Sequence, residues 1–422
     1  MNINLNKDNA KPDIAFFLVL AFLILEYVRP QDLIPVLGNL RPGVFLTLLL
    51  AIFWFFAYDK SSLKENQTIF FILMLILMTI YIPFAHNNFF AYITTKYMWL
   101  KLPFFLGIIA FVNSRKKLDI YITLWMIIGY YIIIKGTLGK GIGGSSFLDD
   151  ENEFCLFVNM LLPFFYFFLI YERKLKGKLF YLIGIILSVV AIITSFSRGG
   201  FIGFLSVCLI ICLKTSKKIL FFSIIILISS VFFFFSNQSY FKEIGTIKNI
   251  NEGTALTRIQ LWKAAWKMWK DNPFGVGPNN FTCCVHKYQP KEMKRSMWGV
   301  QTHSLYFTLL ADLGIFGVFL WFSILYYNIK DIIKLKNLKE HPDTEIRKYY
   351  YLSLAYLVSL VGYLSSGMFV SVLYYSHFYC LTAIIMATRR VIYDLALQQH
   401  LICRFSKIKD SKICQNKSNL MG

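Results

Sequence analysis

The sequence predicts an all-α integral membrane protein of about twelve transmembrane helices, with one large helical loop on the outer face of the membrane. Of its 422 residues, 57% are hydrophobic and only 16% are charged. The mean hydropathy is +0.55, a balance that water-soluble domains of this size do not show. The apolar residues gather into runs long enough to cross a hydrocarbon core of about 30 Å. The Lys and Arg residues lie mainly in short segments between these runs, as in polytopic membrane proteins.

The apolar runs give the expected membrane spans. The first run lacks a small-residue cleavage site, so we expect it to remain as an anchor. The runs on either side of Ser197 and Arg198 are short, and one bent element is an alternative to two spans. The spans are expected near residues 13–28, 43–58, 68–85, 97–113, 118–134, 153–171, 179–195, 199–213, 218–235, 303–328, 349–370 and 373–389.

The distribution of positive charge predicts the orientation in the membrane. Most of the 44 Lys and Arg residues fall on the side that also holds both chain ends, which places both termini in the cytoplasm and loop 236–302 outside. The formal charge of +21 is therefore a topology signal, and no nucleic-acid partner is expected. We expect N-terminal transmembrane helices over 1–144, a core with the outer loop over 145–330, C-terminal transmembrane helices over 331–390, and a basic cytoplasmic tail over 391–422.

Arg198 is the first candidate site residue. It lies in the segment TSFSRGG, residues 194–200, at the outer end of the seventh expected span. A lone Arg at a helix end is commonly a membrane anchor. Small hydroxyl and glycine neighbours, Ser197 among them, suit an anion pocket better than a lipid-facing anchor.

The outer loop contains a predicted helix over residues 257–271, which ends before Asn-Pro. At 100° per residue, Arg258 shares a face with Trp262, Ala265 and Trp269, while Lys263, Lys267 and Lys270 lie opposite. The tryptophans and lysines are typical of an amphipathic surface helix. A cation on the aromatic face requires a ring to stack on or an anion to bind, so Arg258 is a second candidate.

His303 is the third candidate, at the outer start of the tenth expected span. On a helical projection, His303 forms a stripe with Phe307, Leu310, Gly314, Gly317 and Trp321. The two glycines permit close helix packing, so the stripe is expected to face the bundle. A structural histidine and a proton acceptor remain equally open at this point. Asp312 projects to another side, and its role is left open.

Four segments together resemble the O-antigen ligase superfamily of membrane glycosyltransferases. One segment is similar to the pattern H-[NSQ]-x9-G-x-x-[GTY]: it consists of His303 and Ser304, nine residues, Gly314, two residues and Gly317. Residues 194–200 resemble a T-x-x-S-R-G element, residues 150–163 (DENEFCLFVNMLLP) a D-x-N-x-F-x-x-x-L-x-x-P element with one shifted position, and residues 272–281 (NPFGVGPNNF) a P-x-x-G-x-G segment. The resemblance covers about 145–330. Asp312 departs from the family, which more often has Glu there.

The resemblance implies transfer of a glycan from undecaprenyl pyrophosphate to an acceptor hydroxyl on the outer face of a bacterial cytoplasmic membrane. It implies His303 as the general base, giving inversion, and Arg198 and Arg258 as the residues that bind the pyrophosphate. Ser197, Trp262 and Asn152 are expected to contribute to substrate binding. With two arginines at the pyrophosphate and no C-x-x-C or D-x-D spacing, we expect no metal and no other cofactor.

Two alternatives remain at this stage. The first is a polymerase that joins lipid-linked repeat units, and the second is a transporter or flippase of lipid-linked glycan. Apart from Asp312, almost no ionisable residue is expected inside a span, which argues against transport. The acceptor can be a glycolipid, another glycan or a protein hydroxyl.

Overall fold

The computed structural model describes residues 13–142, 148, 150–215, 218, 226, 253–290, 296–340 and 344–392, and every regular element in them is a helix. This confirms the all-α prediction for the described part of the chain. The α-helices are α1 (Ile14–Tyr27), α2 (Pro30–Leu33), α3 (Pro35–Asn39), α4 (Pro42–Phe56), α5 (Asn66–Tyr81), α6 (Asn88–Phe111), α7 (Arg115–Leu138), α8 (Glu151–Tyr171), α9 (Leu175–Thr194), α10 (Arg198–Lys214), α13 (Gly253–Asp271), α14 (Phe281–Tyr288), α15 (Leu305–Lys336) and α16 (Thr344–Ser366). The 3-10 helices are η1 (Ser61–Lys64), η2 (Ile82–Phe84), η4 (Asn337–Glu340) and η5 (Gly367–Phe369). A last helix covers residues 376–392.

Six described helical segments are long and apolar enough to cross a membrane: Asn66–Phe84, Arg115–Leu138, Glu151–Tyr171, Leu175–Thr194, Leu305–Lys339 and Ile346–Phe369. The apolar helices α1 and α4 are shorter. The expected span 218–235 falls almost entirely outside the described residues, as do parts of the outer loop. The total of about twelve spans and the outer position of the loop therefore stay predictions.

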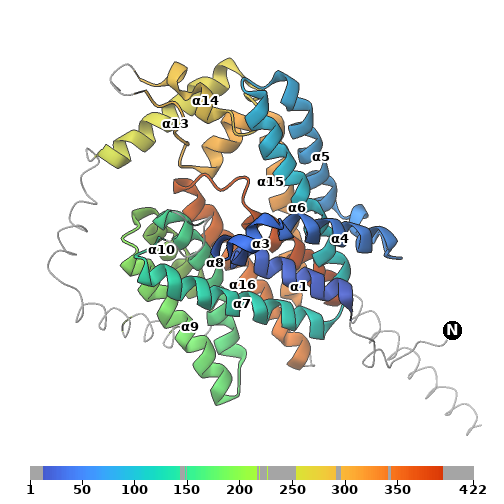
Figure 1. The fold of residues 1–422 in the computed structure, drawn as a ribbon. Helices are drawn as coiled ribbons and strands as arrows, with labels where there is room; N and C mark the ends of the chain where they lie inside the picture. Colours follow the sequence, from blue (N-terminus) through green and yellow to red (C-terminus); the bar gives the residue numbers. More distant parts are fainter. Residues whose placement is uncertain are drawn as a thin grey trace, which may run out of the picture.

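Helix α8 is the centre of the bundle. Within its most apolar 18-residue window, 83% of the residues are buried, against 33% for α9. Helix α16 packs along it, with the rings of Phe164 and Tyr356 5.6 Å apart. Helix α10 also contacts it, because the Asn159 side-chain amide donates to the Gly200 carbonyl oxygen at 2.9 Å. Helix α8 is thus held on several sides (Figure 1).

A small second core caps one end of this bundle. It is formed by α13, α14 and the beginning of α15, drawn in yellow and orange at the top of Figure 1. Leu261, Ala265 and Met268 of α13 pack there on Phe281 and Cys284 of α14. This cap corresponds to the described part of the expected outer loop, and it confirms the amphipathic helix predicted over residues 257–271.

Lys96 and Lys101 both lie within a helix. The expected span in this region begins at residue 97, whereas α6 begins at Asn88 and includes both lysines. The Lys101 ammonium donates to the carbonyl oxygen of Tyr374 at 2.5 Å, which compensates for its removal from water.

Candidate functional site

Asp150, Asn152 and Ser197 join the starts of α8 and α10. Asp150 caps α8, and its carboxylate accepts from the Asn152 backbone N–H at 2.6 Å and side-chain amide at 2.8 Å. The Asn152 amide oxygen accepts from the Ser197 hydroxyl at 2.7 Å. The Ser197 oxygen in turn caps α10 by accepting from the Gly200 N–H at 2.9 Å. Asn152 and Ser197 are each only 3% exposed, so two of the segments recognised in the sequence form one rigid unit.

Arg198 begins α10 directly beside this unit. The alternative of one bent element across Ser197 is wrong, since a turn with Phe196 at φ 56° separates α9 from α10. A Cβ atom added to Gly200 would lie 2.2 Å from the Cβ of Cys155. The glycine thus lets the first turn of α10 pack directly against α8, which fixes the backbone position of Arg198.

Helix α13 holds the segment before α15 through Trp262. Its indole N–H donates to the carbonyl oxygen of Thr302 at 3.0 Å. Its ring stacks on Phe307, with centroids 5.5 Å apart and planes at 15°. Arg258 lies one helical turn earlier on the same face. Trp262 is half-buried between α13 and α15, so it directly positions the residue that precedes His303.

His303 does not belong to the helix face predicted for it. It precedes Ser304, the N-cap of α15, and has a left-handed φ of 49°. The helical period therefore does not apply to it, and the stripe that joined it to Phe307 is wrong at this residue. The conformation turns His303 toward charged groups: burial lowers its pKa, the nearby Arg258 charge lowers it further, and the Asp150 charge raises it.

Gly314 also departs from the predicted helix. Its φ of 59° and ψ of −158° interrupt α15 with a kink. A Cβ atom there would lie 2.2 Å from the backbone carbon of Phe274, and the next N–H, of Ile315, donates to the Pro273 carbonyl at 3.0 Å. Gly314 thus permits close approach of the 272–281 loop. The neighbour of Gly314 is thus a loop and not the helix that was predicted, but Gly314, Gly317 and Trp321 are all buried, as expected for a stripe that faces the bundle.

Asp312 also binds the 272–281 loop. Its fully buried carboxylate accepts from the backbone N–H groups of Asn279 at 2.9 Å and Phe281 at 2.8 Å, and from the Tyr374 hydroxyl at 2.9 Å. The sequence left its role open and gave no signal for Tyr374. Asp312 therefore holds the cap on α15, since a buried carboxylate requires several donors.

A cavity of about 230 Å³ adjoins this region. Its walls include many hydroxyl and amide groups, which are the chemistry that binds sugar hydroxyls. Thr302, immediately before His303, is one of them. The polar lining residues are Thr94, Tyr97, Asn279, Thr282, Gln301, Thr302, Thr308, Asp312, Ser371, Tyr374 and Tyr375.

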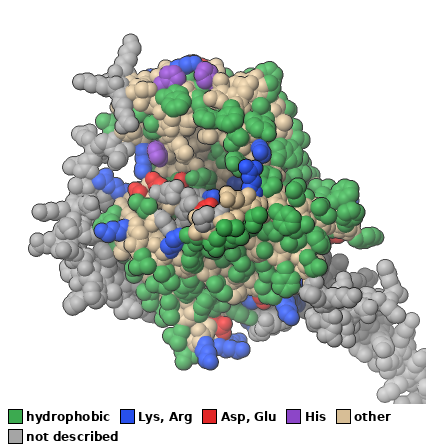
Figure 2. Space-filling model, in the orientation of Figure 1, with side chains coloured by type: hydrophobic (Ala, Val, Ile, Leu, Met, Phe, Trp, Pro, Cys, Tyr) green, Lys and Arg blue, Asp and Glu red, His purple; other side chains and the backbone are tan. Residues whose placement is uncertain are grey.

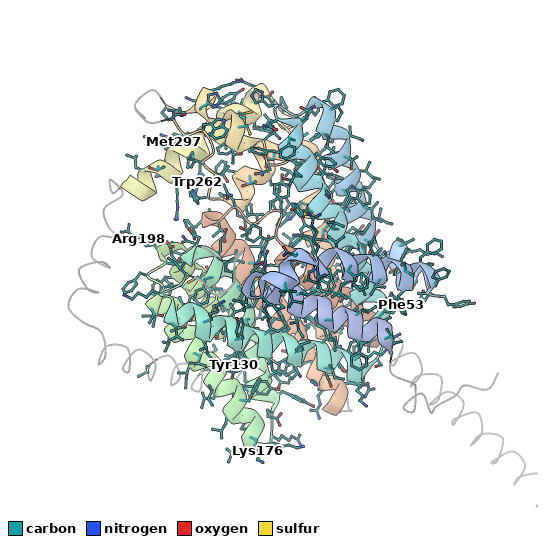
Figure 3. The ribbon with its side chains drawn as sticks, viewed as in Figure 1. Phe53, Tyr130, Lys176, Arg198, Trp262 and Met297 are labelled. Atoms are coloured by element: carbon teal, nitrogen blue, oxygen red, sulfur yellow. The ribbon has the colours of Figure 1, made fainter. Side chains whose placement is uncertain are left out.

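The structure therefore brings most of the predicted site together. His303 interacts electrostatically with Arg258 and Asp150, and Asp150 is connected through Asn152 and Ser197 to the start of α10. In Figure 3, Arg198 lies across from the helix that carries Trp262. Figure 2 shows a hollow in this face. A histidine, basic side chains and acidic side chains lie around it. Asp150 is the site residue that the sequence interpretation did not select, although its place before a helix in D-x-N was a usable signal.

Comparison with known proteins agrees with the motifs. A family model described as O-antigen ligase matches residues 183–322, about a third of the chain. The matched range contains Ser197, Arg198, Arg258 and His303. No curated protein matches the chain. The match, with the motifs that meet at this site, supports an O-antigen ligase- or polymerase-type function and the place of this chain in the O-antigen ligase superfamily.

Proposed function

We propose that this protein is a membrane glycosyltransferase that moves a glycan from undecaprenyl pyrophosphate to an acceptor hydroxyl on the outer face of the bacterial cytoplasmic membrane. The observation that carries the proposal is the position of His303. A half-buried imidazole lies within electrostatic range of one arginine, Arg258, and one carboxylate, Asp150. A proton acceptor beside an anion-binding group is the pair that transfer from a pyrophosphate requires.

In the proposed reaction, neutral His303 accepts the proton of the acceptor hydroxyl. The acceptor oxygen attacks the anomeric carbon, and the bond between that carbon and the pyrophosphate oxygen breaks. The electron pair leaves with undecaprenyl pyrophosphate, and the anomeric configuration inverts. A positioned general base typically contributes about 10²- to 10⁴-fold to such a step.

The charges around His303 suit both the transfer of the proton to the imidazole and the departure of the pyrophosphate. Burial and Arg258 lower its pKa, which keeps the imidazole neutral and able to accept a proton near pH 7. Asp150 acts in the opposite sense and stabilises the imidazolium that forms during the step. Arg258 and Arg198 bind the pyrophosphate oxygens by forked, charge-assisted hydrogen bonds and stabilise the charge that grows on the leaving group.

The polar cavity beside Thr302 supplies a place for sugar hydroxyls close to the base. Trp262 positions Thr302 by its hydrogen bond, and the ring edge that remains accessible offers surface to a sugar. The acceptor class, whether glycolipid, glycan or protein, stays open. A polymerase differs from a ligase only in using a second lipid-linked glycan as the acceptor.

Purified protein in liposomes, supplied with undecaprenyl pyrophosphate glycan and acceptor, tests the proposal. Transferred glycan and released undecaprenyl pyrophosphate are measured together. Arg258→Lys and Arg198→Lys should each reduce transfer at least about 10-fold, because a point charge does not reproduce the forked contact. Lys267→Arg, on the exposed opposite face of α13, is the matched control and should transfer normally.

Normal transfer by both arginine variants would remove the pyrophosphate role from these residues. Movement of the lipid-linked glycan between leaflets, with no transfer to any acceptor, would contradict the enzyme and favour the flippase alternative.

A further inference from the structure

A larger cavity, of about 880 Å³, opens at the far end of α8 from His303. The ends of α8, α9 and α10 form it together with η4 and α16. Asp150 and Asn152 mark the candidate-site end of α8, while Tyr171 at the other end lines this cavity. A helix of 21 residues is about 30 Å long, close to the thickness of the hydrocarbon core. The cavity and the candidate site therefore lie near opposite surfaces of the membrane.

Positive charge dominates the rim of this cavity. Arg173, Lys178, Lys214, Lys339 and Arg347 line it, and all five are exposed. Within the described part of the chain, none of them forms an ion pair with a carboxylate.

Glu172 is the acidic residue among those that line the cavity. Its carboxylate accepts from the backbone N–H groups of Arg173 at 2.8 Å and Lys174 at 2.9 Å, so it is engaged with the turn between α8 and α9. Figure 3 labels Lys176, in the first turn of α9, at this end of the molecule, and Figure 2 shows Lys or Arg side chains gathered there. The rim carries a surplus of positive charge that the described carboxylates do not neutralise.

The wall below the rim is apolar. Leu169 of α8 and Leu179 and Leu182 of α9 contribute to it, and Leu179 is 49% exposed. A soluble phosphate or nucleotide would leave these side chains without a partner. A molecule with an anionic headgroup and acyl chains would contact both the cationic rim and the leucine wall.

We propose that this cavity binds an anionic phospholipid of the adjacent leaflet, and that its headgroup is of the two-phosphate, cardiolipin type. Five cations and one engaged carboxylate leave a net charge of +4 at the rim. Two phosphates neutralise more of this charge than a single phosphate does. Clusters of Lys and Arg between helices at a membrane surface attract anionic lipid headgroups. The predicted orientation makes this the cytoplasmic leaflet.

Lipid binding to the purified full chain tests this inference. Nanodiscs of phosphatidylcholine with a titrated fraction of fluorescent cardiolipin are the probe. The double variant Lys214→Glu/Arg347→Glu should weaken cardiolipin binding at least about 10-fold, and Lys214→Gln/Arg347→Gln should weaken it less. The control Lys64→Glu/Lys116→Glu changes two exposed cations that do not line the cavity, and it should bind as the wild type does.

Equal cardiolipin binding by the cavity variant and the control variant would overturn the proposal. So would equal affinity of the wild type for cardiolipin and for phosphatidylcholine, since the cavity would then recognise only acyl chains. Monodisperse elution of each variant confirms that it is folded. Glycan transfer is not the readout, so the result is independent of the proposed enzymatic function.

Discussion

His303 lies between two opposite charges, and this balance is the main residue-scale feature of the proposed site. Arg258 and burial both disfavour the imidazolium, while Asp150 favours it. The proposed base must be neutral to accept a proton. A pKa below the ordinary 6.5 therefore extends activity toward lower pH, and activity is lost as pH falls through that lowered pKa.

This balance predicts that replacing Arg258 and replacing Asp150 shift the acidic limb of the pH profile of kcat/KM in opposite directions. The acidic limb of the wild type should lie below pH 6.5. Arg258→Gln removes a charge that lowers the pKa of His303, so its limb should move to higher pH. Asp150→Asn removes a charge that raises this pKa, so its limb should move lower, and Asn retains the capping ability of Asp. Shifts in the same direction, or a wild-type limb above pH 6.5, would contradict the electrostatic assignment.

Some single residues were predictable because their signal is local. Arg258 was separated from the lysines of α13 by the helical period alone, and α13 has that orientation: Ala265 is buried and Lys263 and Lys267 are exposed. The role of Asp312 was not predictable. Its backbone donors belong to residues 31 and 33 positions earlier, and no periodic pattern relates residues of a helix to those of a distant loop.

At the scale of elements, the kink in α15 brings together the motif that begins at His303 and the 272–281 segment, which are separate motifs in the sequence. Gly314 accommodates the loop after α13, and the Gly277 N–H donates to the Asp312 carbonyl oxygen at 2.9 Å. Most described helix ranges were close to those predicted, but His303 does not belong to the helix face assigned to it, and Gly314 meets a loop where a helix was predicted. The error arose because the helical period was extended through two residues with positive φ, where it does not hold.

Gly314→Ala should therefore be among the most destabilising single substitutions in the cap. The new Cβ would meet backbone atoms at 2.2 to 2.5 Å, and the backbone conformation is one that only glycine adopts easily. We expect a loss of about 3 kcal/mol or more. Thermal unfolding of the detergent-solubilised protein, followed by the loss of monodisperse protein, measures it.

Gly299→Ala is the matched control for this prediction. Gly299 also has a positive φ, of 82°, but nothing lies within 4 Å of an added Cβ. It should cost only about 1 kcal/mol from backbone strain. Equal losses in the two variants would show that strain alone, and not the contact of α15 with the loop, makes Gly314 necessary.

At the scale of the whole molecule, the proposed site in the cap and the basic cavity are expected on opposite sides of the membrane. The distribution of Lys and Arg predicts the cap outside. A reporter fused after residue 290 should be active only as an exported domain, and one fused after residue 340 only as a cytoplasmic domain. The reverse result at either fusion would move the candidate site to the cytoplasmic side and exclude an outer-face transferase.

The fold class and the four motifs were predictable because composition and short-range spacing determine them. The convergence of the motifs was not, because it depends on how α8, α10, α13 and α15 pack. Asn152 meets Ser197 across 45 residues, and Trp262 meets Thr302 across 40. The resemblance to a family suggested that these segments act together, and the hydrogen bonds supply the physical reason.

The central claim is that His303 is the base of a glycan transfer, and transfer rate per folded molecule of His303→Gln tests it most directly. Gln retains hydrogen-bonding capacity at this position but does not accept the proton. The variant should still bind undecaprenyl pyrophosphate glycan while transferring it at least about 10²-fold more slowly than the wild type. Wild-type turnover by folded His303→Gln protein would contradict the claim.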